Sequence, residues 1–333
     1  MDTPGRVKLA DVAARAGVSV ATVSKVVNGR YGVAKQTIAT VQEVIDDLGY
    51  VGNLGASGLR NSRTNVVGIL VADFEPYSSE LIKGAARATN GTPYDVMAYA
   101  GGDGSGWERR SLARLGGTLI DGAVVVTPTS LDAAISLPVA AVHPHYSSTW
   151  LPHIDCDNAG GGESAATHLI ELGHRRIAFI GGRQSADSSE LRETGFRDAM
   201  RQAGIPVTED LVRYSRFDPD AAHQIASALL SLPEPPTAII AANDLTAMRV
   251  MDAARARGLR VPEDVSIVGF DDVPEALLCD PPLTTVRQPL QAMGAAAMTM
   301  LLAILDGREH DQHLRMDTEL IVRSTTAPPR VSQ

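Results

Sequence analysis

The sequence predicts a mixed fold, in which a small all-α N-terminal domain precedes an α/β body of doubly wound parallel sheets arranged in two lobes. Before residue 50, apolar residues recur at helical spacing in three segments. From residue 66 onward, short β-branched runs alternate with helical patterns, which indicates parallel strands joined by right-handed crossovers. The roughly 260 residues of this second part are too many for one comfortable sheet, so we expect two lobes.

The charge of the chain is unevenly distributed. The 333 residues are 44% hydrophobic and carry a net charge of -9. Residues 1–63 hold eight Lys/Arg and five Asp/Glu, a local charge of +3, which leaves -12 on the remainder. A basic head on an acidic body suggests that the head binds a polyanion. No apolar run is long enough for a membrane span or a signal sequence, so we expect a cytoplasmic protein without a membrane partner.

The helical patterns of the head have recognisable ends. The first, in LADVAARAGV, stops at Gly17, a residue that can adopt the left-handed conformation found at helix ends. Ser19 is a good cap for a second, short helix, and a third pattern closes at Gly49. Two short helices joined by a tight glycine turn are typical of a helix-turn-helix, although the same spacing fits a hairpin of any small helical bundle.

The run from residue 7 to 71 closely resembles the DNA-binding head of the LacI/GalR family of bacterial repressors. It contains LADVA, AGVS, ATVS, VVNG, the LGY that closes the third helix, and the RTN that precedes the first strand. The resemblance implies a helix-turn-helix domain at residues 1–50 and a hinge at 51–65. It also implies that residues 20–28 form a recognition helix in the major groove of double-stranded operator DNA.

On this resemblance, contacts with DNA come from both the head and the hinge. Lys25 can donate to guanine, and Val20 and Ala21 offer apolar contact to bases. The serine and threonine hydroxyls of the head would position phosphates or cap helices. Leu59 would insert between base pairs in the minor groove, although two glycines in the segment also fit a flexible linker. The expected DNA-contacting residues are Lys8, Ser19, Val20, Ala21, Thr22, Ser24, Lys25, Asn28, Thr37, Asn53, Ala56 and Leu59.

The body resembles the type I periplasmic-binding-protein-like domain of the same family, in runs such as ELIKGA, AANDLTAM and VPEDVSIVGFDD. The resemblance implies a ligand-binding and dimerisation domain over residues 66–333, with lobe 1 at about 66–160 and 290–325 and lobe 2 at about 161–289. Ligand would lie in a cleft beyond the carboxyl ends of the strands. The expected strands are 66–71, 95–100, 122–127, 176–180, 237–242 and 266–270.

The expected effector-binding residues follow these strands or match the family's cleft. Arg192 would clamp sugar hydroxyls through its planar guanidinium, or could instead form a surface ion pair. Phe217 would stack on a pyranose face, and Asp244 and Asp271 would accept further hydroxyls or cap helices. The full set is Asp73, Phe74, Glu75, Tyr77, His143, Ser188, Arg192, Phe217, Asn243, Asp244 and Asp271.

Enzymatic and metal-binding interpretations find little support in the sequence. The glycine run at 100–106 lacks the spacing of a nucleotide-binding loop, and neither GxSxG nor HExxH occurs. His143, His145, His153 and Cys156 could bind zinc but lack a compact ligand pattern. We therefore expect no catalytic residues, no metal site and no cofactor.

We predict a homodimeric transcriptional regulator, a repressor of carbohydrate-use genes that a mono- or disaccharide releases from its operator. The alternative is a repressor that needs a bound corepressor, such as a non-sugar metabolite. A solute-binding protein for transport is a weaker candidate, because it would need export and would carry no DNA-binding head.

Overall fold

The computed structural model of the chain describes residues 7–27, 32–48, 63–102, 104–129, 131, 137–145, 150–184 and 187–330. The chain divides into two compact units, Met1–Asn65 with Leu115–Asp121, and Val66–Arg114 with Gly122–Gln333. Among the helices of the described ranges, none is long and apolar enough to cross a membrane.

The described part of the head contains three helices, α1 (Leu9–Ala16), α2 (Val20–Val27) and α3 (Lys35–Leu48). Each contributes to a small core of buried Val12, Ala13, Val23 and Val41. Ala13 is buried within α1, and its carbonyl oxygen accepts a hydrogen bond from Val18 N–H of the following turn at 3.1 Å. The helices therefore enclose their apolar stripes among themselves, as the 3.6-residue pattern predicts.

The turn between α1 and α2 has the predicted chemistry. Gly17 has a φ of 66°, in the left-handed region that glycine adopts without a steric cost. Ser19 Oγ accepts a hydrogen bond from Thr22 N–H at 3.1 Å and so satisfies a free donor at the start of α2. The predicted helix-turn-helix is confirmed.

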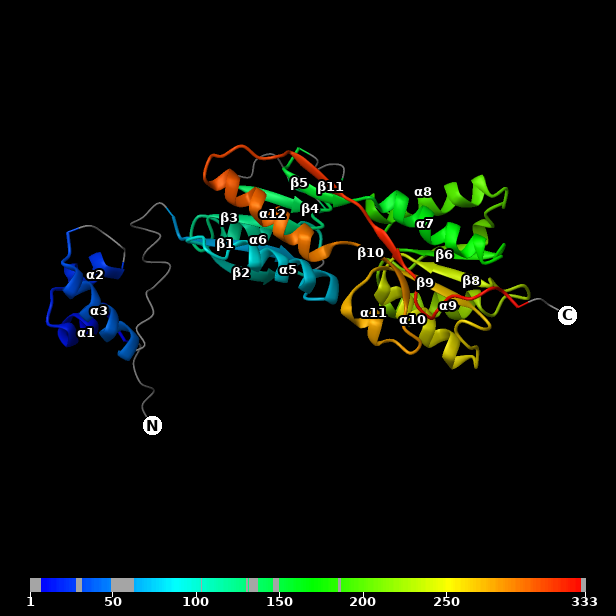
Figure 1. Cartoon of the computed structure of the whole chain (residues 1–333), viewed down its shortest axis with the longest axis horizontal. Coiled ribbons are helices and arrows are strands. Elements are labelled where there is room, and N and C mark those ends of the chain that lie inside the picture. Colours follow the sequence, from blue (N-terminus) through cyan, green and yellow to red (C-terminus); the bar gives the residue numbers. More distant parts are fainter. Residues whose placement is uncertain are drawn as a thin grey trace. The chain divides into compact units, whose positions relative to one another are not determined.

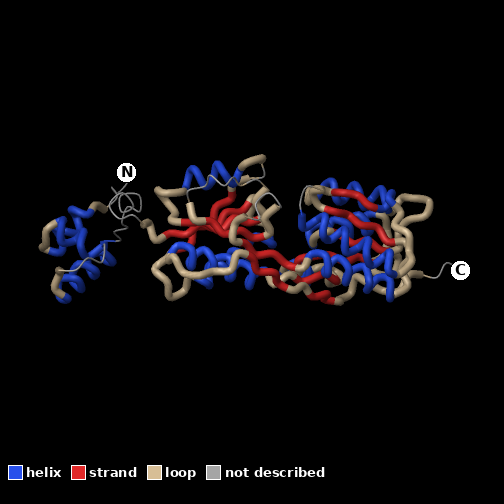
Figure 2. Tube along the Cα trace, turned by 90° about the horizontal axis from the view of Figure 1, so that it is seen from above, coloured by secondary structure: helices blue, strands red, loops and turns tan. Residues whose placement is uncertain are grey.

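The first lobe is a six-stranded sheet with helices on both faces (Figure 2). Its strand order is β11-β5-β4-β3-β1-β2, and all neighbours are parallel. The strands are β1 (Val66–Val71), β2 (Asp95–Ala100), β3 (Gly122–Val126), β4 (Val139–Val142), β5 (His153–Cys156) and β11 (His313–Met316), and the helices are α5 (Pro76–Ala88), α6 (Trp107–Leu115) and α12 (Leu290–Leu305). Strands β1, β3 and β4 are buried along their whole length because both faces of the sheet are covered.

The second lobe repeats this design with strand order β12-β10-β9-β8-β6-β7, in which only β12 is antiparallel to its neighbour. Its apolar core has two clusters, one beneath α9 and α10 and the other beneath α7 and α8. The strands are β6 (Ile177–Gly181), β7 (Val212–Tyr214), β8 (Ala238–Ala241), β9 (Ser266–Asp271), β10 (Thr284–Arg287) and β12 (Glu319–Ile321), and the helices are α7 (Asn158–Glu171), α8 (Asp187–Gln202), the 3-10 helix η2 (Glu209–Leu211), α9 (Pro219–Leu229), α10 (Asp244–Ala256) and α11 (Pro274–Leu278).

Three described segments cross between the lobes, from β5 to α7, from β10 to α12 and from β11 to β12 (Figure 1). Because β12 pairs with β10, the chain leaves the first sheet after β11, earlier than the expected residue 325. The expected two-lobed α/β body is otherwise confirmed. In each sheet the strand order reverses between two neighbours, β1 and β3 in the first and β6 and β8 in the second. Open α/β sheets bind ligands beyond the strand ends at such a point.

Candidate functional site

The outward face of α2 is formed by Val20, Ala21 and Lys25. Val20 is 49% exposed, whereas Val23, one turn further along the helix, is fully buried. Ser24 is half-buried on the same helix. An exposed face of small, apolar and cationic side chains, free of carboxylates, suits contact with base edges and phosphates.

The remaining head residues have local structural partners. The Ser19 and Thr22 hydroxyls lie 2.8 Å apart at the start of α2, where Ser19 caps the helix. Lys8 donates its backbone N–H to Asp11 Oδ2 at 2.7 Å at the start of α1, and Thr37 is half-buried in the first turn of α3. Asn28, Asn53, Ala56 and Leu59 lie outside the described residues.

Polar side chains of both lobes meet where the chain crosses between the sheets. Cys156 Sγ, at the end of β5, donates to Gln288 Oε1 at 3.0 Å. Gln288 Nε2 donates to Asp271 Oδ1 at 2.6 Å, and Arg192 Nη1 lies 3.5 Å from that same oxygen. We call these four residues, together with Tyr77 and His143, the interlobe cluster.

Arg192 is held rigidly by the second lobe and is only 5% exposed. Gly162 lets α7 approach α8 so closely that a Cβ at this position would overlap the Arg192 backbone. Arg192 Nε donates to Asn158 Oδ1 at 2.8 Å, and Nη1 donates to the Ala242 carbonyl oxygen. The guanidinium carbon also lies 3.7 Å from the centroid of the Phe270 ring. The alternative of a surface ion pair is therefore wrong.

Asp271 ends β9 in a strained conformation, with a φ of 112°. Burial raises the pKa of its carboxyl to about 7, although the Arg192 guanidinium opposes the shift. Such a group can hold or release a proton near neutral pH. Its strained backbone fixes the carboxyl beside Arg192 at the carboxyl edge of the sheet.

Asp244 has a supporting position inside the second lobe and no exposed surface. Its carboxylate accepts hydrogen bonds from Val273 N–H at 2.9 Å and from the Thr285 hydroxyl. Burial, together with the nearby Asp271, raises the pKa of this carboxyl well above its usual range. Asp244 thus positions the turn after Asp271. The cap of α10 is instead Asn243, whose Oδ1 accepts from Thr246 N–H at 2.9 Å.

Tyr77 and His143 form the first lobe's part of the interlobe cluster. Tyr77 Oη lies 2.8 Å from His143 Nδ1, and His143 Nε2 accepts from Cys156 N–H at 3.2 Å. Burial lowers the pKa of His143 to about 3, so the ring is neutral at pH 7. With Nε2 as an acceptor, the proton lies on Nδ1 and is donated to Tyr77 Oη. The Tyr77 hydroxyl proton can then be donated to a ligand.

The loop after β1 presents the remaining predicted residues of the first lobe. Asp73, Phe74 and Glu75 are exposed, and the Phe74 side chain is 54% exposed. Desolvation by the surrounding protein raises the pKa of Glu75, and the negative charge of Asp73 raises it further. The positive charge of Arg183 in the second lobe opposes this shift. The charges of Glu75 and Arg183 therefore act on each other between the lobes.

Aromatic and hydroxyl groups complete the second lobe's side. The half-buried Phe217 has a φ of 63°, and its ring lies so close to Gly182 that a Cβ there would overlap it. Ser188 is half-buried in the first turn of α8, whereas its neighbour Ser189 is buried and accepts from Gly182 N–H at 2.9 Å. Strand β6 and helix α8 are thereby joined next to Phe217.

Sequence reasoning missed three residues of this region, Asn158, Arg183 and Gln288. Asn158 lies two residues after β5 and Gln288 directly after β10, where the chain crosses between lobes, and both bind members of the interlobe cluster. The available signal was a polar side chain just beyond a strand. Their partners are far away in sequence, so their pairing required the folded structure.

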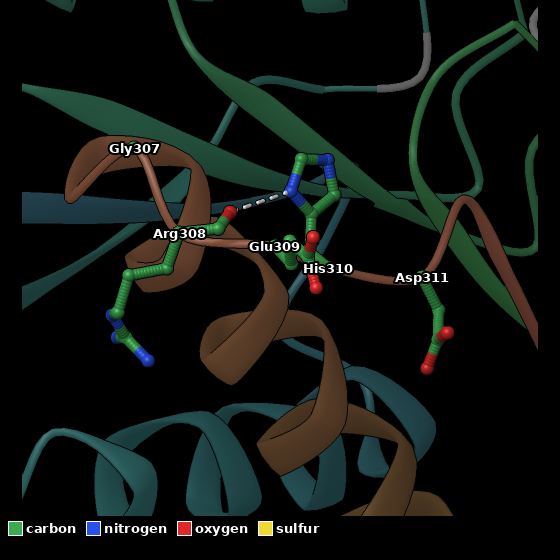
Figure 3. A pocket seen from close by; sticks show the side chains of 5 residues that line it. All are labelled: Gly307, Arg308, Glu309, His310 and Asp311. Atoms are coloured by element: carbon green, nitrogen blue, oxygen red, sulfur yellow. Dashed lines mark hydrogen bonds between the residues drawn. The ribbon is translucent and has the colours of Figure 1, made fainter.

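A separate pocket lies in the loop between α12 and β11, lined by Gly307, Arg308, Glu309, His310 and Asp311 (Figure 3). Its side chains are exposed except for the half-buried His310, whose Nδ1 lies 3.2 Å from the Arg308 carbonyl oxygen. The 16-residue helix α12 starts beside the interlobe cluster and ends at this loop. The pocket is therefore about 24 Å away along the helix, and we do not assign the effector to it.

Two family models match the chain. The model described as bacterial regulatory proteins of the lacI family matches residues 8–53, and the periplasmic binding protein-like domain matches residues 166–326. The first match covers the three helices of the head. The second covers most of the second lobe and also includes α12 and β11.

Similar proteins cover nearly the whole chain. The regulator DegA of Bacillus subtilis is 33% identical over 329 residues, which span 96% of this chain and 97% of DegA. A solved complex of the regulator CelR with cellobiose is 32% identical, has a TM-score of 0.71, and covers 96% of this chain and 100% of its own. The lac repressor dimer bound to operator and an anti-inducer is 26% identical, has a TM-score of 0.81, and covers 97% and 100%.

Proposed function

Because the chain belongs to the lacI family of bacterial regulatory proteins, a family of DNA-binding transcriptional regulators, we propose that it represses carbohydrate-use genes and that a sugar relieves this repression. The observation that carries the sugar assignment is the interlobe cluster. Its donors and acceptors lie at the strand ends of two lobes, and the Phe270 ring lies against the Arg192 guanidinium. The CelR complex with cellobiose supports the same ligand class.

The chemistry of the cluster suits a polyhydroxylated ligand. Arg192 supplies a planar fork of N–H donors for two neighbouring hydroxyls, and Asp271 supplies acceptors beside it. The Tyr77 hydroxyl can donate from the opposite lobe. Phe217 and Phe74 offer apolar ring faces on the two sides. A sugar presents hydroxyls at its edges and C–H groups on its faces, so it needs both kinds of partner.

For DNA recognition, we assign base contacts to the exposed face of α2 and phosphate contacts to the helix termini of the head. Lys25 is the cationic donor on that face. The hinge residues Asn53, Ala56 and Leu59 complete the proposed surface, with Leu59 as the minor-groove wedge. We also propose a homodimer, which would read two half-sites about one helical turn apart. The exposed Leu277 and Leu278 of α11, the latter 81% exposed, would contribute to its interface.

Ligand control follows from the position of the cluster at the lobe crossings. A sugar that contacts both lobes binds most tightly to one lobe arrangement, and only that differential affinity can shift the equilibrium. The arrangement that it favours would separate the paired hinges and withdraw Leu59 from DNA. The opposite preference would make the ligand a corepressor.

The test is fluorescence anisotropy of the full chain on DNA from upstream of its own gene, at fixed salt, titrated with pentoses, hexoses and disaccharides including cellobiose. We expect one sugar class to release the DNA. Tightening by a ligand would replace induction with corepression. Tight DNA binding that no sugar alters would refute the sugar assignment but leave the regulator class intact.

Two variants separate the two proposed surfaces. Lys25→Ala should weaken operator binding while leaving the sugar affinity of the free protein unchanged. If Lys25 reads guanine, the loss should concentrate at one position per half-site, whereas a uniform loss would make it a phosphate contact. Leu59→Ala should also weaken operator affinity without changing sugar affinity. An unchanged operator affinity would reject the wedge.

A further inference from the structure

A second polar cluster lies on one face of the outer pair of strands in the first sheet, apart from the interlobe cluster. Strand β11 is the edge strand and pairs in parallel with β5, with His313 opposite His153 and Arg315 opposite Asp155. Side chains two residues apart on a strand point to the same face. The strand pairing therefore brings two imidazoles and one carboxylate together from positions distant in sequence.

We propose that His153, Asp155 and His313 form a binding site for a divalent transition-metal cation of the zinc type. Each residue offers one ligand atom, and these atoms lie within 4.8 Å of one another. Two imidazole nitrogens and one carboxylate oxygen form a donor set that Zn²⁺ accepts, with water in the fourth position. Tetrahedral Zn²⁺ holds such atoms about 3.3 Å apart, so closing the site requires shifts on the order of 1 Å.

His153 has the tautomer that a metal ligand needs. Its Nδ1 lies 2.8 Å from the Leu151 carbonyl oxygen and must donate to it, because a carbonyl cannot donate. The proton is thereby fixed on Nδ1, and Nε2 keeps its lone pair. Metal-bound histidines usually donate their second nitrogen to a carbonyl or carboxylate in this way. His153 is only 8% exposed, and its ring stacks on the His313 ring with centroids 4.4 Å apart.

Asp155 is ionised and already close to the second imidazole. Hydrogen bonds from Arg315 and His313 hold the pKa of this carboxyl below its usual range, against the effect of burial. Asp155 Oδ1 lies 3.0 Å from His313 Nε2, and Oδ2 accepts from Arg315 Nη2 at 3.0 Å. A cation between Oδ1 and Nε2 would displace the shared proton to solvent while Arg315 keeps Oδ2. Arg315 would also compete for Oδ1, which its Nε contacts at 3.1 Å.

The site joins two of the three segments that cross between the lobes. Strand β5 continues into α7 and β11 continues towards β12, and the cluster lies within a few residues of both crossings. A cation there would fasten the edge strand to its neighbour. Binding should therefore raise the thermal stability of the body, since the cation binds the folded chain.

Isothermal titration of the chelator-treated full chain with Zn²⁺ tests this assignment. We expect one Zn²⁺ per chain and a higher Tm when it is present. His313→Ala should weaken binding by at least about tenfold, as should Asp155→Asn, which keeps the side-chain shape if the first variant folds poorly. Arg315→Gln should tighten binding because it removes the competing cation.

The matched control is His310→Ala, which removes another histidine three residues earlier and should leave Zn²⁺ affinity unchanged. The proposal is overturned if the wild type binds no Zn²⁺, if His313→Ala binds it as tightly as the wild type, or if His310→Ala weakens it equally. An Arg315→Gln variant that binds Zn²⁺ more weakly would also overturn the assigned ligand set. None of these readouts depends on DNA or sugar.

Discussion

The two lobes present different surfaces to the space between them. In the second lobe the polar side chains are buried and bonded to each other, with Arg192 5% and Asp244 0% exposed. In the first lobe the corresponding loop after β1 carries the exposed Asp73, Phe74 and Glu75. The second lobe thus holds its binding groups in place before a ligand arrives, whereas a ligand must order and desolvate the exposed loop residues of the first.

This difference assigns separate tasks to the lobes. Fixed donors and acceptors contribute affinity because little entropy is lost when they bind. Exposed loop residues vary in sequence more readily without cost to the core, so they suit discrimination between related ligands. Both tasks rest on the proposed sugar site. Mutations of the fixed groups in the second lobe should lower stability or affinity strongly, whereas mutations in the exposed loop of the first lobe should have small effects.

The largest difference between the two lobes should appear in the free energy of unfolding, when Asp244→Ala in the second lobe is compared with Asp73→Ala in the first. The substitution removes the acceptor for Val273 N–H and for the Thr285 hydroxyl and leaves both donors buried. We expect the free energy of unfolding to fall by roughly 2–4 kcal/mol, measured by urea denaturation. The matched Asp73→Ala should change it by less than about 0.5 kcal/mol, and equal losses would contradict the comparison.

The next effect concerns ligand response. Arg192→Ala should abolish release of DNA by the sugar and lower sugar affinity by roughly 10- to 150-fold, the equivalent of about 1.5–3 kcal/mol for a charged hydrogen bond. Operator affinity without sugar should stay unchanged. Arg192→Lys keeps the charge but loses the fork, so it should recover little of the affinity. Retained sugar affinity in Arg192→Ala would remove this residue from the site.

A smaller effect is expected in the pH dependence of stability. Burial raises the pKa of Asp271 to about 7, compared with about 3.9 in an unfolded chain. The folded state binds more protons in that window, so this group's contribution to stability falls as pH rises from about 4 to about 7. Asp271→Asn should therefore lose less stability than the wild type between pH 5 and 8.

Urea denaturation at several pH values measures this difference. The control Asn243→Ser changes a buried polar residue of the same lobe without adding or removing a titratable group, so its profile should parallel that of the wild type. A profile of Asp271→Asn that also runs parallel would show that Asp271 does not titrate in this range.

Features encoded by local residues were predictable from the sequence. The glycine turn of the head, the first strand at 66–71 and the strand end carrying Asp271 follow from periodicity and capping. The placement of Arg192 came from the family resemblance, because a single arginine in a helical pattern does not reveal whether it is buried.

Long-range pairing was not predictable in the same way. Nothing local to β11 shows that His313 lies opposite His153 or that β12 joins the second sheet. Gln288 contacts Cys156 across 132 positions in the sequence. Such contacts depend on the order and register of strands, which neighbouring residues do not specify.

The smallest effect should come from Phe74→Ala. The ring is 54% exposed in the free protein, so its removal should change the free energy of unfolding by less than about 0.5 kcal/mol. In contact with a sugar the ring would contribute about 0.5–1.5 kcal/mol, so affinity should fall roughly 2- to 12-fold.

Phe217→Ala is the matched variant on the other lobe. Since its ring packs on Gly182, we expect it to lower both stability and sugar affinity. If Phe74→Ala costs as much stability as Phe217→Ala, the loop after β1 is already packed without ligand and the contrast between the lobes fails. If stability and affinity both stay unchanged, the loop lies outside the sugar site, and discrimination must come from the fixed residues of the second lobe.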